Sequence, residues 1–157
     1  MEKLKVLFIC RDNSVRSQMA AAMLNAYFGE RYEACSAGVD PLKIDPRTVK
    51  VMQEIGIDLS SSCAKSIEEF RGKKFACVIT LCDYAEGFLG RLPEHKKKLH
   101  KSFKDYCLPH LCQSAAECGM RSAADAKYRN TDEEKTLTAF RCLKEEIAEW
   151  VEKEVAF

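Results

Sequence analysis

The sequence lacks the features that mark a membrane or a secreted protein. No apolar run approaches the roughly 18 residues that a transmembrane helix needs, and the apolar run Val6–Cys10 is too short for the core of a signal peptide. Net charge is nearly absent too, because 25 Lys and Arg residues face 24 Asp and Glu residues. This balance argues against general binding to nucleic acid or to a membrane surface. We therefore expect a cytoplasmic protein with neither of these partners.

The chain also lacks the paired Cys-x2-Cys spacing of common structural zinc sites, although cysteine itself is abundant. There are 9 cysteines in 157 residues. An odd number without a visible export signal argues against a disulfide scaffold. We expect mostly thiols, some buried as small hydrophobic residues and a few reactive. The patterns around Cys35, Cys77 and Cys142 favour packing roles for these three, whereas Cys63 is assigned no role.

Apolar patterning predicts an α/β fold in a single domain over residues 1–157. Continuous or short apolar runs predict four strands, over Lys5–Ile9, Tyr32–Ala37, Phe75–Leu81 and, as an edge strand, Lys96–Leu99. Helical spacing predicts three main helices, over Ser17–Phe28, Pro46–Ile55 and Asp132–Glu154, with a short one capped by Ser66. Strands that alternate with helices indicate a four-stranded parallel sheet with helices on both faces.

The segment 106–130 fits no element of this pattern and is predicted to be an insertion before the last helix. It has no clean period and carries three cysteines, Cys107, Cys112 and Cys118. Long segments of this kind are either functional or disordered. With His110 these cysteines could form a zinc site, but loop thiols with or without a redox role are favoured and no metal is expected.

The polar stretch after the first strand is the main candidate for chemistry. Cys10 ends a buried strand, Arg16 precedes a helix, and the loop between them can direct backbone N–H groups and the helix dipole at an anion. Arg16 can bind two oxygens of a tetrahedral oxyanion. These groups predict a lowered pKa and a thiolate at Cys10, with Ser17 placed to hydrogen-bond it. The alternative is a buried cysteine and a surface arginine.

The residues around this loop resemble the low-molecular-weight protein tyrosine phosphatase superfamily. The resemblance rests on Val6–Cys10, Arg16–Ala20, Ser36–Gly38, Val78–Cys82 and Phe103–Asp105, with Phe140-Arg141 in the last helix. Within the superfamily, Gln18 stands where the phosphatases usually carry Pro, and Arg16–Ala20 is more similar to the thiol-coupled arsenate reductases. The resemblance spans about residues 3–105 and 131–152.

The resemblance implies a role for each matching position. Cys10 would be the nucleophile, Asp105 the general acid, and Cys82 the second redox thiol that attacks the Cys10 adduct. Asn13 would hold the loop in an unusual backbone conformation, and Ser17 would stabilise the thiolate. The oxyanion would lie in a loop made of Arg11, Asp12, Asn13, Ser14, Val15 and Arg16.

The chain departs from the family pattern at four places. Leu89 occupies the position at which many reductases carry a further, resolving cysteine, and Tyr106 follows Asp105 where the family normally has Pro. Ala21 and Lys65 replace the acidic residues with which some reductases bind potassium. The insertion has no counterpart in the family. Its Cys107, Cys112 and Cys118 are possible resolving thiols, and the alternative is that an external thiol reduces the Cys10–Cys82 disulfide directly.

Three functions follow from these residues. The first is arsenate reduction, which needs no bound cofactor but requires thioredoxin, glutaredoxin or a small thiol to reset the enzyme. The second is hydrolysis of phosphotyrosine or a small phosphate ester by the same Cys10, Arg16 and Asp105. Gln18 and Cys82 favour the reductase, and Leu89 favours the phosphatase. The third, a non-catalytic oxyanion or redox sensor, is disfavoured because the full set of chemical groups is present.

Overall fold

A computed structural model of the chain describes residues 2–104 and 133–156, and its centre is a four-stranded parallel sheet. The strands lie in the order β2-β1-β3-β4. Their bounds are Leu4–Cys10 for β1, Tyr32–Gly38 for β2, Lys74–Thr80 for β3 and Glu94–His100 for β4. The α/β fold class is confirmed. The edge strand is longer than the sequence indicated, because β4 pairs with β3 from Glu94 to His100, beyond Lys96–Leu99 in both directions.

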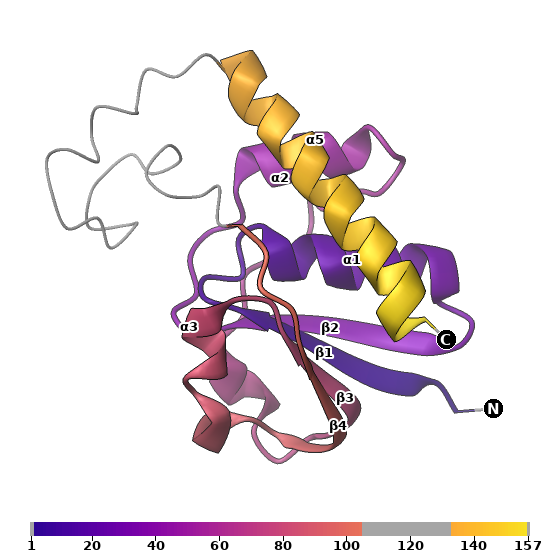
Figure 1. Ribbon diagram of the computed structural model, residues 1–157, viewed down its shortest axis with the longest axis vertical. Helices are drawn as coiled ribbons and strands as arrows, with labels where there is room; N and C mark the ends of the chain where they lie inside the picture. The colour runs from indigo at the N-terminus through magenta and orange to yellow at the C-terminus, as the bar shows by residue number, and fades with distance from the viewer. Residues whose placement is uncertain (1, 105–132, 157) are drawn as a thin grey trace, which may run out of the picture.

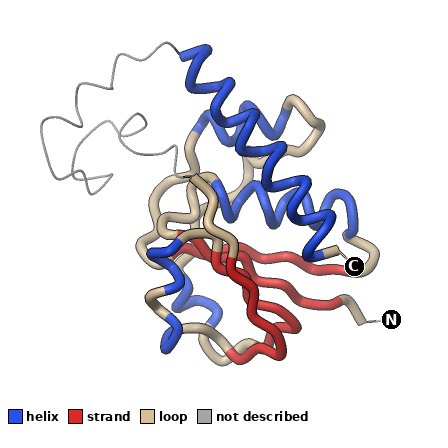
Figure 2. Tube along the Cα trace, viewed as in Figure 1, coloured by secondary structure: helices blue, strands red, loops and turns tan. Residues whose placement is uncertain are grey.

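Helices cover both faces of the sheet (Figures 1 and 2). On one side lie α1 (Arg16–Phe28), α2 (Pro46–Gln53) and α5 (Glu133–Trp150). On the other side lie the short α3 (Asp83–Glu86) and the 3-10 turns η1 (Ile67–Phe70) and η2 (Leu89–Arg91). Because β1 is enclosed by this arrangement, Val6 to Cys10 are all buried, as a continuous apolar run in a parallel strand predicts.

The last helix closes the domain through an apolar stripe at helical spacing. Leu137, Phe140, Leu143 and Ile147 are buried on it. The helix passes into a single π-helical stretch, Val151–Val155, where the sequence indicated continued α-helix. Cys142 lies on the opposite side of this helix and is exposed, so the expected packing role for Cys142 is wrong. A position in a helical pattern shows on which face of the helix a residue lies, but not whether that face is buried.

Two contacts tie α5 to the rest of the domain. The guanidinium of Arg141 donates to both carboxylate oxygens of Glu54, just after α2, at 2.8 Å and 2.9 Å. At the other end of α5, the rings of Trp150 and Phe103 meet edge to face with centroids 5.8 Å apart. Phe103 lies in the segment after β4, so the last helix also buttresses the chain that leads toward Asp105.

No helix in the part of the chain that the structure describes is long and apolar enough to span a membrane. The segment predicted as an insertion, 106–130, falls between the described ranges, and with it Asp105, Cys107, Cys112 and Cys118. The expectations for these residues stay predictions.

Candidate active site

The loop between β1 and α1 lies at the carboxyl end of the sheet, and the chain that follows β2 holds it in place. The backbone N–H groups of Val39, Asp40 and Leu42 donate in turn to the carbonyls of Cys10, Arg11 and Asp12, at 2.7–3.2 Å. Two parallel segments are thus bonded beyond the end of the strands themselves. This position is where parallel α/β sheets place their ligand sites.

Gly38 allows the loop to approach β2 this closely. A Cβ at position 38 would lie 2.8 Å from the carbonyl carbon of Asp12 and 2.9 Å from the nitrogen of Asn13. Both neighbours are backbone atoms, which cannot move aside as a flexible side chain could. The match of Ser36–Gly38 to the family therefore has a steric reason that the sequence alone did not reveal.

The sulfur of Cys10 is fully buried and has two hydrogen-bond partners. The Asn13 backbone N–H donates to it at 3.3 Å, and the Ser17 hydroxyl lies 2.9 Å away. The Ser17 oxygen also accepts a bond from Asn13 Nδ2 at 2.7 Å, so Asn13 holds the Ser17 hydroxyl beside the sulfur. The predicted juxtaposition of Cys10 and Ser17 is present.

Asn13 organises the loop through both its backbone and its amide. Its φ of 56° makes it the sole non-glycine residue with a positive φ in residues 2–104 and 133–156, a conformation that Asn tolerates better than most residues. Its Oδ1 accepts from Gln18 Nε2 at 3.0 Å and from the Lys65 backbone N–H at 2.9 Å. Gln18 also donates to the Cys63 carbonyl at 3.2 Å. Gln18 therefore connects the loop to the segment before η1, a role that its use as a family marker did not suggest.

Arg16 opens α1 and is buried beneath the loop that it is predicted to serve. Its side chain is 4% exposed, and Nη1 donates to the Phe103 carbonyl at 3.3 Å. This bond fixes the chain two residues before Asp105 against the Cys10 loop. The structure therefore brings together Cys10, Asn13, Arg16 and Ser17. The segment that leads to the predicted general acid, Asp105, lies next to them at Phe103.

The predicted ionisation of Cys10 is wrong for this geometry. Burial and, second, the nearby Asp12 carboxylate raise the pKa of Cys10 to about 11. Arg16 and the Ser17 hydroxyl act in the opposite direction and do not outweigh these effects. The sequence argument counted the cation and the N–H donors but neither the complete burial of the sulfur nor the charge of Asp12.

Asp12 was predicted only as part of the oxyanion loop, but its side chain has a definite place. The carboxylate Oδ1 accepts from the Ser14 backbone N–H at 3.1 Å and from the Ser14 hydroxyl at 2.8 Å. Such a bond to the backbone two residues on is an Asx turn, which the Asp12-Asn13-Ser14 sequence could have revealed. On its other side, the Ser14 carbonyl accepts from the Asp45 N–H and the Thr48 hydroxyl. The loop is thereby joined to the start of α2.

Cys82 lies at the same end of the sheet as Cys10. The register pairs Ile9 with Thr80, and the Leu81 N–H donates to the Ile9 carbonyl at 2.8 Å. Cys82, the next residue, is buried and lies at the N-cap position just before α3, with extended backbone angles. All six cysteines in the described part of the chain are free thiols, Cys10 and Cys82 among them.

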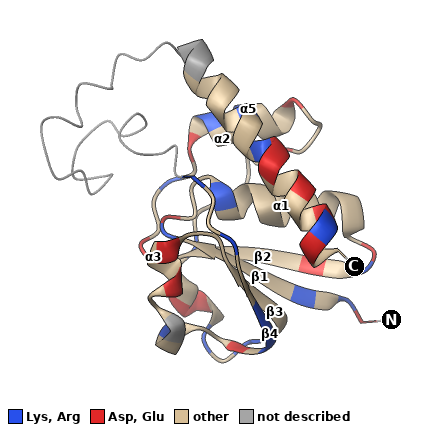
Figure 3. Cartoon of the chain, in the orientation of Figure 1, with Lys and Arg blue, Asp and Glu red and all other residues tan. Residues whose placement is uncertain are grey.

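A polar cluster holds α3 behind Cys82. The Thr80 hydroxyl lies 2.7 Å from Glu86 Oε2 and 2.8 Å from His100 Nδ1, and His100 Nε2 lies 3.1 Å from Asp83 Oδ1. Lys98 donates to Glu86 at 2.6 Å, and together with Thr80 it lowers the pKa of Glu86. In Figure 3, α3 carries acidic positions, in red, and β4 carries basic ones, in blue. Lys98 and His100 of β4 therefore fix α3.

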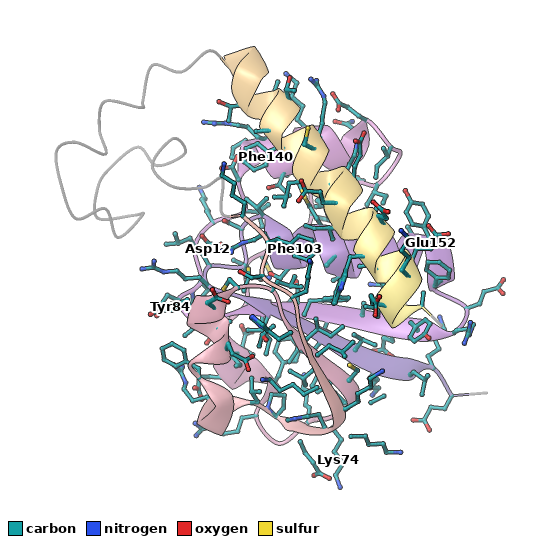
Figure 4. All side chains as sticks on the ribbon, viewed as in Figure 1. Asp12, Lys74, Tyr84, Phe103, Phe140 and Glu152 are labelled. Carbon is teal, nitrogen blue, oxygen red and sulfur yellow. The ribbon has the colours of Figure 1, made fainter. Side chains whose placement is uncertain are left out.

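Arg11 and Tyr84 connect the loop to α3 from the other side. The Arg11 guanidinium lies 4.6 Å from the centre of the Tyr84 ring. The Tyr84 hydroxyl donates to Asp40 at 2.6 Å, and its ring packs 5.1 Å from that of Phe88. Figure 4 shows Asp12, Tyr84 and Phe103 at the same end of the sheet. Although Arg11 belongs to the predicted oxyanion loop, its side chain engages Tyr84.

No group of three or more His, Cys, Asp and Glu side chains in the described ranges is arranged to hold a metal ion. Lys65 and Ala21 stand where some reductases carry acidic residues that bind potassium. Lys65 donates its backbone N–H to Asn13, and Ala21 is buried beside a cavity of about 730 Å³ between α1, β2 and the segment before η1. The side chain of Leu89 and the insertion cysteines lie outside what the structure describes.

Known proteins are similar to this chain in sequence and in fold. An arsenate reductase of Halalkalibacterium halodurans is 33% identical over 147 residues, which cover 94% of this chain and 91% of the relative. An arsenate reductase in the phosphate binding state superimposes with a TM-score of 0.71 at 24% identity, covering 98% of this chain and 97% of the other, and shows the shared fold. A low molecular weight protein tyrosine phosphatase from T. tengcongensis superimposes with a TM-score of 0.57 at 26% identity, covering 94% and 99%.

A family model described as low molecular weight phosphotyrosine protein phosphatase matches residues 5–153. The match includes every segment on which the resemblance rested, from Val6–Cys10 to Phe140-Arg141 in the last helix. On this match and on the similarity to its relatives, the chain belongs to the low molecular weight phosphotyrosine protein phosphatase family.

Proposed function

We propose that this protein is an arsenate reductase that uses Cys10 as its nucleophile. The observation that carries the proposal is the presence of a second buried thiol, Cys82, at the same end of the sheet as the loop of Cys10 and Arg16. Hydrolysis of an ester needs one thiol, whereas reduction of an oxyanion needs two electrons, which a pair of thiols can supply. The relatives that are named arsenate reductases support the same assignment.

In the proposed reaction, arsenate binds in the loop and the Cys10 sulfur bonds to arsenic as an arsenic–oxygen bond breaks and water leaves. Because the pKa of Cys10 is raised, the thiol gives up its proton as this bond forms. Arg16 balances the charge of the oxyanion. We assign to Asp105 the protonation of the leaving oxygen; this assignment is supported by the Arg16–Phe103 bond, which fixes the chain two residues away.

The second step would reduce arsenic. The Cys82 sulfur attacks the Cys10 sulfur, the sulfur–arsenic electron pair passes to arsenic, and arsenite leaves a Cys10–Cys82 disulfide behind. Thioredoxin, glutaredoxin or a small cytoplasmic thiol would then reduce the disulfide, either directly or through Cys107, Cys112 or Cys118. Mapping the disulfides formed with one equivalent of arsenate distinguishes the two routes, because only the second gives a bridge from Cys82 to an insertion cysteine.

The alternative function is hydrolysis of phosphate monoesters. It is favoured by the family to which the chain belongs and by Leu89 in place of a resolving cysteine. Both functions use Cys10 and Arg16, so the deciding experiment runs two assays on one preparation. Arsenate-dependent oxidation of a thiol reductant is measured beside hydrolysis of an aryl phosphate. Turnover of the ester without any arsenate-dependent oxidation would replace the first proposal by the second.

A further inference from the structure

The loop that joins Cys10 to Arg16 contains a carboxylate at the place where the site is expected to receive an anion. Asp12 is 6% exposed. Its Oδ1 accepts the Ser14 backbone N–H at 3.1 Å and the Ser14 hydroxyl at 2.8 Å. The Asp12 carboxylate therefore occupies, from within the protein, a loop N–H donor of the kind that binds oxyanions.

The charge of Asp12 affects the pKa of two neighbouring groups. It raises the pKa of Cys10, after burial, and contributes to raising the pKa of Asp45, whose largest cause is also burial. Arg16 and the start of α1 act with the opposite sign. Apart from Arg11, whose guanidinium lies against Tyr84, the loop thus carries one buried cation, one buried carboxylate and a helix terminus, and charges in a buried region are screened less than at the surface.

We propose that Asp12 makes the loop bind its oxyanion together with one proton, shared between Cys10 and the oxyanion, and weakens the binding of doubly charged oxyanions relative to singly charged ones. A dianion beside a thiolate and the Asp12 carboxylate would place three neighbouring anionic groups against Arg16. Retaining one proton removes one negative charge. The proposal rests on the proposed use of the Cys10 loop as an oxyanion site.

The retained proton has a use in the proposed reaction. A Cys10 thiol with HAsO₄²⁻, or a thiolate with H₂AsO₄⁻, holds the same two protons. When the sulfur–arsenic bond forms and an arsenic–oxygen bond breaks, the proton that Asp105 gives to the leaving oxygen is replaced by the shared one, so the net change removes both protons in one water molecule and the adduct keeps the charge of −2. With a phosphate ester, the shared proton would in the same way replace the one that Asp105 gives to the leaving ester oxygen. Asp12 is a positioning residue in this scheme, because it acts through Cys10 and the oxyanion.

The test compares the affinity for two tetrahedral ions of different charge, sulfate and perrhenate, by calorimetry near neutral pH. Asp12→Asn removes the charge but keeps an Oδ1 acceptor for Ser14. We expect the variant to bind sulfate about tenfold more tightly and perrhenate less than about threefold more tightly, because the interaction scales with the ligand's charge. Asp40→Asn is the control: Asp40 is exposed and its N–H donates to the Arg11 carbonyl, so screening should keep both changes below about twofold.

A second readout follows the Cys10 proton. Alkylation of the Cys10 peptide by iodoacetamide, followed by mass spectrometry across pH, should shift to lower pH by about one pH unit in Asp12→Asn. An unchanged sulfate-to-perrhenate ratio together with an unchanged alkylation profile would overturn the proposal. If the variant does not fold, the wild-type protein decides: binding sulfate more than about tenfold more tightly than perrhenate contradicts a loop biased against double charge.

These measurements involve no turnover, so they separate the two proposals. A wild-type protein that shows the expected charge selectivity but oxidises no thiol with arsenate contradicts the proposed function and leaves the role of Asp12 standing. A protein that reduces arsenate while Asp12→Asn changes neither readout contradicts only the role of Asp12.

Discussion

The two thiols of the site are held in different ways. Cys10 lies in a loop whose contacts are buried and largely local in sequence: Asn13, Ser17 and Gln18 bond to it or to one another within eight residues. Cys82 lies just before a helix of only four residues, which is fixed by side chains that are partly exposed, such as Glu86, His100 and Tyr84.

This difference has an energetic consequence. Buried hydrogen bonds in a low dielectric stabilise strongly and cost much when one partner is lost, whereas exposed ion pairs contribute about 0–1 kcal/mol and weaken in salt. We expect the Cys10 loop to be the rigid half of the site and α3 to be the half that moves at a small free-energy cost. A nucleophile needs a fixed approach, while a second thiol must travel to reach a sulfur.

The largest effect should come from the rigid half. Cys10→Ser should lower both arsenate turnover and ester hydrolysis by about ten-thousand-fold or more, because a serine hydroxyl is a weaker nucleophile than the thiol and gives up its proton less readily as the new bond forms. Steady-state assays of both reactions measure it. Arsenate binding by the variant, followed by calorimetry, is the control for an intact loop. Retention of most of either activity would remove Cys10 from that reaction.

The next effect should separate the two thiols. Cys82→Ser should reduce arsenate turnover by about a thousand-fold or more and leave ester hydrolysis within about threefold, because only the reduction requires a second thiol. Cys77→Ser, a half-buried cysteine of β3, is the matched control and should affect neither assay strongly. Unchanged arsenate turnover in Cys82→Ser would exclude this thiol from the mechanism.

A smaller effect is expected from the contact that positions the loop. In Gly38→Ala, the new Cβ would meet Asp12 and Asn13 backbone atoms at 2.8–2.9 Å. We expect a loss of about 1–3 kcal/mol in the free energy of unfolding and a fall in both activities, measured by denaturant titration and by the two assays. Gly90→Ala is the control, since nothing lies within 4 Å of a Cβ at that position. Equal stability and activity of the two variants would show that the loop can shift.

The smallest effect should appear at α3. Glu86→Gln removes the partner of Lys98 and should lower the free energy of unfolding by less than about 1 kcal/mol, an effect that shrinks in high salt. The pKa of Glu86 is lowered by Lys98, so this stabilisation is present at neutral pH and is lost as the pH falls through the lowered pKa, below the ordinary 4.5. Glu149→Gln on α5, which removes a fully exposed partner of Lys153, is the control. A loss above about 2 kcal/mol would contradict the view of α3 as weakly held.

Much of the fold was predicted from the sequence because its signals are local. The unbroken apolar run before Cys10 predicted a buried parallel strand, and the helix predicted to begin at Pro46 begins there as α2. The Asp45 side chain caps it by accepting from the Arg47 N–H at 2.8 Å. The last helix was predicted from the spacing of Phe140 and Leu143. The exposure of Cys142 was missed, because helical spacing does not show how wide the buried face is.

The sequence by itself determined the chemical groups of the site: a thiol after a strand, an arginine at a helix start, and a second thiol after another strand. Only the tertiary structure decided their electrostatics and their supports. Cys10 becomes fully buried, and this burial together with the charge of Asp12 raises the pKa of Cys10 instead of lowering it. Gly38, Lys65 and Phe103 reach the loop from distant segments. Burial and the interaction between charges depend on which distant segments pack together, and no local pattern of residues encodes that packing.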